Sequence, residues 1–193
     1  MKNIDDLCVI VQSRLNSERV PRKMLKPFAG TTLFENVIDT IKKTKLGKKN
    51  FYVSVFEQEL KDIASSKGVK IFNRSEKSAE SEAIRIGELF EWWNKLPFTY
   101  VIVVNGCCPF LKPETIDNFI SNCKDNADFY SGLINIENIP PEIEPFKKSS
   151  GFYLKERKGY FRTANLVLFD GSNVSDKKRE YMESFVEKAF SKY

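Results

Sequence analysis

The chain has 193 residues, of which 41% are hydrophobic and 30% are charged, a composition typical of a globular domain with a substantial core. It contains no histidine, which excludes a histidine general base, a serine–histidine–aspartate triad and histidine-ligated zinc. The formal charge of +5 suits a polyanionic ligand such as a nucleoside triphosphate. It would also suit nucleic acid, but the basic residues form no long tract and no nucleic-acid-binding motif is present, so we expect no nucleic-acid partner.

No apolar run approaches the ~20 residues that would span a bilayer, and residues 1–6 lack the apolar region of a signal peptide. The four cysteines have neither metal-ligand spacing nor the pattern of a disulfide framework. Cys8 and Cys123 are typical of small core residues, and the adjacent pair Cys107–Cys108 favours a tight turn over a redox pair. We therefore expect one domain over residues 1–193, located in the cytoplasm and without a membrane partner.

The continuous apolar run from Leu7 to Val11 predicts a first strand that is buried on both faces. It opens into a loop over residues 12–23 that carries four cations and one acid. A buried strand followed by a basic loop suits an anion held at the carboxyl end of an α/β sheet. Ser17 and the loop backbone would bond phosphate oxygens, with charge from Arg14 and Lys23. The loop lacks the glycines and the Gly-Lys-Ser/Thr ending of a Walker loop.

Helical and strand patterns alternate after the loop, which predicts a mostly parallel sheet with right-handed crossovers. The first helix begins at a capping box formed by Thr32 and Glu35 and ends near Gly47. Further helices are predicted over 57–66, 83–93, 113–123 and 175–190. Further strands are predicted over 51–56, 69–72, 100–104, 128–134, 151–154 and 161–169.

The run Arg14-x-x-Ser17-x-Arg19-x-Pro21-x-Lys23, directly after the first strand, resembles the signature of the sugar-acid cytidylyltransferases. These enzymes include the synthetases of CMP-acylneuraminate and CMP-ketodeoxyoctonate. The resemblance implies a Rossmann-like nucleotidyltransferase fold, an α/β three-layer sandwich with a mostly parallel sheet. The alternative interpretation of the same run is a solvated basic turn between strand and helix.

The resemblance also implies roles for individual residues on the nucleotide side of the site. Arg14 and Lys23 would be catalytic and neutralise the triphosphate, while Ser17 and Arg19 would help to bind it. Arg74 matches an arginine that begins a segment lying against the nucleotide base in the family, although the Leu-Ala-x-Asp pattern that follows there is absent. The alternative is that Arg74 is a surface residue, with Ser78 serving as a helix cap.

On the acceptor side, Asn105 matches the amide that contacts the sugar in the acylneuraminate enzymes, and Arg162 and Asn165 fall where the family often has an Arg-x-Asn-Gly element. Cys107 occupies the position at which ketodeoxyoctonate-type enzymes carry an aspartate for magnesium, and a thiol is a poor ligand for that hard cation. The best-placed carboxylate for a magnesium ion is Asp170, for which a simple turn role is the alternative.

Residues 135–150 form the one long irregular connection, which matches a dimerisation arm of the family and implies a homodimer. The implied reaction transfers CMP from CTP to a small nonulosonic or ketodeoxyoctonic-type sugar acid, with Mg²⁺ bridging phosphates, for bacterial surface glycan synthesis. Two alternatives remain open from the sequence: a degenerate nucleotide- or sugar-binding homologue that lacks the metal carboxylates, and a nucleic-acid-binding module that only the net charge supports.

Overall fold

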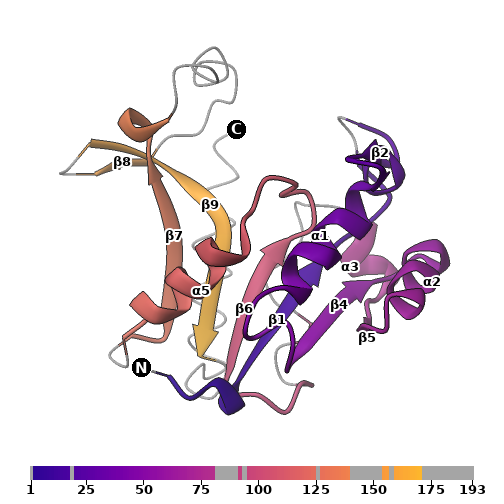
Figure 1. Cartoon of the computed structure of the whole chain (residues 1–193), viewed down its shortest axis with the longest axis horizontal. Helices are drawn as coiled ribbons and strands as arrows, with labels where there is room; N and C mark the ends of the chain where they lie inside the picture. Colours follow the sequence, from indigo (N-terminus) through magenta and orange to yellow (C-terminus); the bar gives the residue numbers. More distant parts are fainter. Residues whose placement is uncertain are drawn as a thin grey trace.

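The computed structural model describes residues 2–17, 20–80, 91–92, 95–124, 127–139, 154–156 and 159–170. Within these residues, seven strands form one sheet in the order β5-β4-β1-β6-β9-β7, with β8 paired to β9 (Figure 1). The strands are β1 (Leu7–Gln12), β4 (Phe51–Val55), β5 (Lys70–Asn73), β6 (Tyr100–Asn105), β7 (Phe129–Asn135), β8 (Leu154–Glu156) and β9 (Gly159–Asp170). The α-helices are α1 (Leu33–Lys42), α2 (Gln58–Ser66), α3 (Glu76–Glu80) and α5 (Pro113–Asn122).

Strand direction divides the sheet into two parts. Strands β5, β4, β1 and β6 are parallel, as the alternation of strands and helices predicts. Strand β9 is antiparallel to both of its long neighbours, β6 and β7, so the sheet is mixed. The predicted α/β fold with a mostly parallel sheet is confirmed.

The centre of the sheet is β1, which lies between β4 and β6. From β1 the chain first moves outward through β4 and β5, and then crosses back to add β6 on the other side. Such a reversal of strand order leaves a crevice at the carboxyl ends of the strands, where ligands bind in open α/β sheets. The loop after β1 starts at this point.

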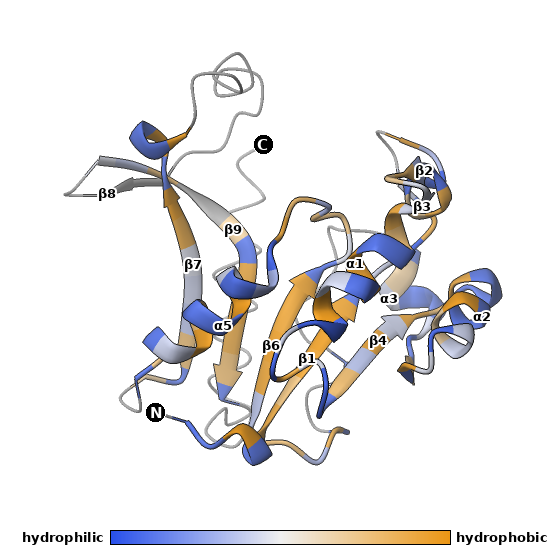
Figure 2. Ribbon diagram, in the orientation of Figure 1, coloured by the Kyte–Doolittle hydropathy of each residue, from blue (hydrophilic) through white to orange (hydrophobic). Residues whose placement is uncertain are grey.

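Both faces of β1 are buried, as its unbroken apolar sequence predicts. Leu7, Val9 and Val11 face one core cluster, and Cys8 and Ile10 face the other. Figure 2 shows β1 and β6 as the hydrophobic centre of the molecule. Burial raises the pKa of the Cys8 thiol to about 12, so this cysteine stays protonated and acts as a small core residue.

Three helices, α1, α2 and α5, contribute to the first of these clusters and therefore share one face of the sheet. The predicted capping box of α1 is present, because the Thr32 hydroxyl accepts the Glu35 N–H at 3.2 Å and the Glu35 carboxylate accepts the Thr32 N–H at 2.9 Å. The opposite cluster contains the fully buried Trp92. Trp92 is therefore a core residue. Most of the helix predicted over 83–93 lies outside the described residues.

Some details differ from the sequence prediction. Helix α1 ends at Lys42 instead of near Gly47, and a short hairpin of β2 (Pro27–Phe28) and β3 (Thr31–Thr32) precedes it. A Cβ atom at Gly47 would lie 1.8 Å from the Ile41 carbonyl oxygen, so the residue allows a close backbone approach after the helix. The predicted helix at 175–190 and positions 140–150 of the predicted arm lie outside the described residues. Among the residues that the structure describes, no helix is long and apolar enough to cross a membrane.

Candidate functional site

Polar and charged residues gather where the parallel strands end. Ser13 and Arg14 follow β1, Glu57 lies two residues beyond β4, Arg74 follows β5, and Gly106 follows β6. We call this end of the sheet the carboxyl edge, and the residues 13–23 that leave it the phosphate loop. The sheet topology thus brings together residues that are widely separated in the sequence.

Two arginines are buried at the carboxyl edge, although this residue type is rarely buried without a partner. Arg14 is 8% exposed, and its Nη1 donates to the Ala79 carbonyl at 3.3 Å. Arg74 is 4% exposed and donates from Nε to Ser78 Oγ at 2.8 Å, from Nη1 to the Ser13 carbonyl at 3.2 Å, and from Nη2 to the Ser78 carbonyl. Burial, and then the charge of Arg14, lower the pKa of Arg74 to about 10. A bound anion would offset both effects.

The phosphate loop is packed against the segment around α3. Besides the contact from Arg14, the Asn16 side chain donates to the Glu80 carbonyl at 3.2 Å. Ser17 is buried, and its N–H donates to the Leu15 carbonyl at 2.8 Å in a tight turn. Arg19 lies outside the described residues. The loop is thus a folded element with its own internal hydrogen bonds, in contrast to the alternative of a solvated turn.

Lys23 is placed at the start of a single 3-10 turn, Lys23–Leu25, which follows the left-handed residue Arg22 with φ of 54°. The two cations predicted to be catalytic, Arg14 and Lys23, therefore come from one loop that follows β1.

The loops after β1 and β6 touch at Ser13 and Gly106. The Gly106 N–H donates to the Gln12 carbonyl at 3.0 Å, and a Cβ atom on Gly106 would lie 1.8 Å from Ser13 Oγ. Residue 106 must therefore be glycine for Ser13 to keep its present position. Ser13 Oγ itself is buried and has no hydrogen-bond partner among the described residues.

Two amides predicted to bind the acceptor come together from different strands. The β6–β9 register ends with Val104 opposite Leu166, so Asn105 and Asn165 are the next residues on the two strands. Asn165 adopts a left-handed conformation, with φ of 51°, close to the register shift between β7 and β9. Such irregularities re-aim side chains, and they are common next to active sites.

Cys107 and Cys108 follow this amide pair in the turn after β6. The Asn105 carbonyl Oδ1 accepts the Cys107 N–H at 3.1 Å, which closes a tight turn, as predicted for the cysteine pair. The hydrogen bond with Cys107, followed by burial, raises the pKa of the Cys108 thiol, while a hydrogen bond with Asn165 and the charge of Lys23 oppose this shift. Asn105, Asn165 and the turn after β6 therefore form one cluster.

Of two further predicted site residues, one lies away from the predicted site and the other has a side chain outside the described residues. Asp170 pairs with Tyr100 at the first residue of β6, and its N–H donates to the Asp128 carbonyl at 2.7 Å. Asp170 is thus at the opposite, amino edge of the parallel strands and does not lie with the predicted metal site, because β9 runs antiparallel to β6. The backbone of Arg162 pairs with that of Ile134. The side chain of Arg162 lies outside the described part of the structure.

Arg74 is neither a surface residue nor a residue directed only at a ligand, because all three of its donor nitrogens bond the protein itself. Ser78, the suggested helix cap, accepts from Arg74, and its own N–H donates to Ser75 Oγ at 3.2 Å. A further residue of the site, not predicted from the sequence, is Glu57, whose Oε1 accepts the Leu15 N–H at 2.6 Å. The available signal was an acid directly after a predicted strand.

The donor set does not fit a protein-held magnesium ion. No cluster of three or more histidine, cysteine, aspartate or glutamate side chains suited to a metal occurs in the part of the chain that the structure describes. Cys107 offers a soft thiol, and Asp170 lies at the other edge. Carboxylate or water oxygens are the ligands that Mg²⁺ prefers.

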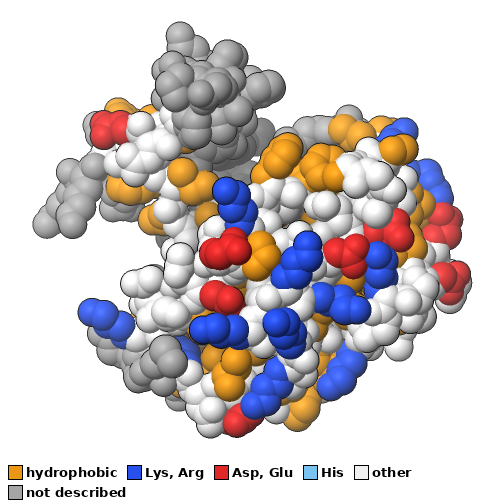
Figure 3. Space-filling view, viewed as in Figure 1, with side chains coloured by type: hydrophobic (Ala, Val, Ile, Leu, Met, Phe, Trp, Pro, Cys, Tyr) orange, Lys and Arg blue, Asp and Glu red, His pale blue; other side chains and the backbone are white. Residues whose placement is uncertain are grey.

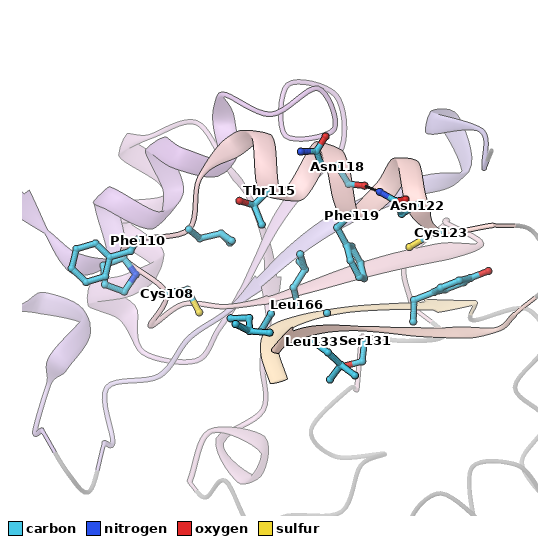
Figure 4. Close-up of a pocket in the computed structure, with 16 residues that line it drawn as sticks. Cys108, Phe110, Thr115, Asn118, Phe119, Asn122, Cys123, Ser131, Leu133 and Leu166 are labelled. Atoms are coloured by element: carbon cyan, nitrogen blue, oxygen red, sulfur yellow. Dashed lines mark hydrogen bonds between the residues drawn. The ribbon is translucent and has the colours of Figure 1, made fainter. Parts of the chain in front are cut away.

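A groove of about 740 Å³ extends from the carboxyl edge between α5 and strands β7 and β9. In Figure 4, Phe119 of α5 points toward Leu166 of β9, whereas the side chains of Ser131 and Leu133 point away from α5. Cys108 and Phe110 lie at one end of the groove (Figure 4). The sequence did not predict this groove, because its two walls are far apart in the chain.

The molecular surface gives a further indication of ligand type. On the face that carries α1 and α5, Lys and Arg side chains alternate with Asp and Glu side chains (Figure 3). This face is a mixed surface, whereas nucleic-acid-binding proteins present a basic stripe or patch. The buried arginines at the carboxyl edge indicate a small anion instead.

Comparison with known families gives a match between residues 8–186 and the family model described as cytidylyltransferase. A 3-deoxy-manno-octulosonate cytidylyltransferase of Rickettsia bellii is 28% identical over 134 residues, which cover 68% of this chain and 54% of the relative. The spore coat polysaccharide biosynthesis protein SpsF of Bacillus subtilis is 24% identical over 139 residues, covering 68% and 55%. The chain thus spans about half the length of the curated relatives it matches.

Solved structures share the fold at low sequence identity. A cytidylyltransferase from Leptospira borgpetersenii superposes with a TM-score of 0.62 and 18% identity, covering 97% of this chain and 73% of that one. A CMP:2-keto-3-deoxy-manno-octonic acid synthetase complexed with CTP gives a TM-score of 0.65 and 13% identity, covering 96% and 86%. These similarities establish the nucleotidyltransferase fold.

Proposed function

The chain belongs to the cytidylyltransferase family, and from this premise we propose that it transfers CMP from CTP to a small sugar acid and releases pyrophosphate. The acceptor class that we propose is a nonulosonic or ketodeoxyoctonic-type acid, destined for a surface glycan. The observation that carries the proposal is the pair of buried guanidinium groups, Arg14 and Arg74, at the carboxyl end of the central strand. A bound triphosphate would provide the negative charge that this pair needs.

The proposed chemistry is an in-line displacement at the α-phosphorus. The anomeric hydroxyl oxygen of the acceptor forms a bond to this phosphorus and its proton is released to water, while the bond to the bridging oxygen breaks and pyrophosphate leaves with the electron pair. Arg14 and Lys23 would neutralise the charge on the phosphate oxygens, and Ser17 with the loop backbone would fix the triphosphate. Catalysis of phosphoryl-type transfer depends mainly on such positioning and charge stabilisation.

On the acceptor side, Asn105 and Asn165 would orient the sugar acid at the end of β6. Side-chain amides both donate and accept hydrogen bonds, which suits the hydroxyl groups of a sugar. We assign no protein ligand to Mg²⁺, because the described residues offer no carboxylate set for it. Any divalent ion would be held by triphosphate oxygens and water, and no step above depends on it.

The proposal is tested by measuring pyrophosphate release with CTP, Mg²⁺ and a panel of nonulosonic and ketodeoxyoctonic acids. We expect turnover with one acid, reduced about 10²-fold or more in Lys23→Ala, since a lost electrostatic donor at a transition state typically costs that much. The matched control is Lys26→Ala, which removes an exposed lysine from the same region and should leave turnover unchanged.

If the whole panel gives no turnover, CTP is titrated into the same protein by calorimetry. Binding without turnover would overturn the transferase proposal in favour of a homologue that only binds nucleotide. Absence of CTP binding would overturn the nucleotide assignment itself.

A further inference from the structure

Two hydrogen bonds from outside the phosphate loop hold the backbone on either side of Arg14. The Ser13 carbonyl accepts from Nη1 of Arg74 at 3.2 Å, and the Leu15 N–H donates to Oε1 of Glu57 at 2.6 Å. The two side chains come from the ends of neighbouring strands, Glu57 after β4 and Arg74 after β5. The backbone of Arg14 is therefore fixed from both directions.

Glu57 does not cap its own helix. It occupies the N-cap position of α2, where a Ser, Thr, Asp or Asn side chain usually accepts an N–H group of the first helical turn. Its side chain makes no such capping hydrogen bond. The carboxylate reaches across to the phosphate loop instead, so a helix-capping role does not explain the residue.

Glu57 offsets part of the positive charge of this arrangement. The negative charge of Glu57 raises the pKa of Arg74 and thus opposes the effects of burial and of Arg14. The second carboxylate oxygen of Glu57, Oε2, is buried and has no hydrogen-bond partner among the described residues. A carboxylate with a buried, unbonded oxygen is costly unless a neighbouring cation compensates it, which links Glu57 to Arg74.

We propose that Glu57 and Arg74 are positioning residues that hold the backbone of Arg14 in a geometry ready for the triphosphate. This inference rests on the proposed function for its effect on catalysis, but the hold on the loop is a property of the free protein. The position of Arg14 depends on these two hydrogen bonds. Small misplacements of such groups can lower a rate about 10²-fold, because reaction requires close alignment.

The hold on the loop is tested first, without any nucleotide. Amide hydrogen exchange at Leu15 should become at least several-fold faster in Glu57→Ala, because the N–H loses its acceptor. Glu57→Gln keeps an acceptor oxygen and should largely retain protection. Glu114→Gln, which makes the same chemical change at an exposed position in the first turn of α5, should not alter exchange at Leu15.

The effect on function is then measured as CTP affinity and as separate kcat and KM values. Glu57→Ala should lower kcat/KM about tenfold or more, with most of the loss in kcat, because the loop can still bind but is poorly aligned. Arg74→Lys keeps the charge but loses the planar fork, and should give a similar loss. In the double variant the losses should be less than additive, since both changes release the same backbone.

Three results would overturn the inference in distinguishable ways. Unchanged Leu15 exchange in Glu57→Ala would show that the carboxylate does not hold the loop. Faster exchange with unchanged CTP affinity and turnover would show a purely structural contact. Additive losses in the double variant would show two independent residues. If the wild-type protein binds no CTP, the proposed function fails, whereas the exchange experiment still decides whether Glu57 holds the loop. Thermal melting of each variant confirms that it is folded.

Discussion

Polar groups at the two edges of the parallel strands differ in how fully they are paired within the protein. At the amino edge these groups are paired within the protein: Asn50 donates to the Leu7 carbonyl at 3.0 Å, and the buried Lys2 ammonium lies 3.8 Å from the centre of the Tyr100 ring. Asp170 is likewise tied to its neighbours by a backbone hydrogen bond. The polar groups named here are thus satisfied by contacts within the protein.

At the carboxyl edge, three buried polar atoms have no hydrogen-bond partner among the described residues: Ser13 Oγ, Ser54 Oγ and Glu57 Oε2. Leaving such an atom unpaired costs about 1–3 kcal/mol. Because the same strands supply both edges, the difference does not come from the composition of the sheet. The two edges therefore differ in how far their described polar groups are paired, and the three predictions that follow probe this contrast.

The largest expected effect is a difference in CTP binding between a variant at the carboxyl edge and a variant at the amino edge. Arg14→Ala should weaken CTP binding roughly ten- to hundredfold, the equivalent of a charged hydrogen bond worth about 1.5–3 kcal/mol. Asp170→Asn, at the amino edge, should leave the CTP dissociation constant unchanged. Calorimetric titration measures both. Equal losses in the two variants would remove the functional distinction between the edges.

The close approach of Gly106 to Ser13 provides a test of packing at the carboxyl edge. Gly106→Ala should lower the free energy of unfolding by about 1–3 kcal/mol, because the new methyl group must displace the Ser13 side chain. Adding Ser13→Ala removes the closest atom and should restore part of the loss. Urea unfolding measures the free energies, and a double variant no more stable than Gly106→Ala would contradict the assigned clash.

The smallest expected effect concerns Thr32 and Glu35, whose polar groups already bond each other. Thr32→Ala should cost about 1 kcal/mol at neutral pH, because α1 loses its capping box. The backbone hydrogen bond from Thr32 lowers the pKa of Glu35, so the contribution of Glu35 is present above the ordinary carboxyl pKa and is lost as the pH falls through the lowered value. The cost of Thr32→Ala should therefore shrink in acid. Thr31→Ala is the control, and a pH-independent cost would argue against the reciprocal bond.

Local signals were enough to predict much of this fold. The apolar run of β1, the capping box of α1 and the basic phosphate loop each depend on residues close together in the sequence. The carboxyl edge could be predicted in outline, because alternating strands and helices imply a parallel sheet whose strand ends converge. Arg14 and Lys23 follow from that outline.

The remaining features depend on register and on contacts between distant segments. The burial of Arg74, the reach of Glu57 to Leu15 and the contact of Ser13 with Gly106 each require knowledge of which strands are neighbours. The position of Asp170 was missed for the same reason, since the sequence pattern does not fix the direction of β9. A residue at the end of a strand lies at opposite edges in the two directions.

The position of β9 also has a consequence for how the sheet is assembled. The β1–β4 pairing joins residues 9–12 to residues 51–54, whereas β9 must bring residues 166–170 to residues 100–104. In the described sheet β7 is joined to the rest only through β9, although it precedes β9 in the chain. All four parallel strands lie within residues 7–105, so they are synthesised before β7 and β9. We therefore expect the parallel strands to pair first during synthesis. Strand β7 should join the sheet only after β9 has been synthesised.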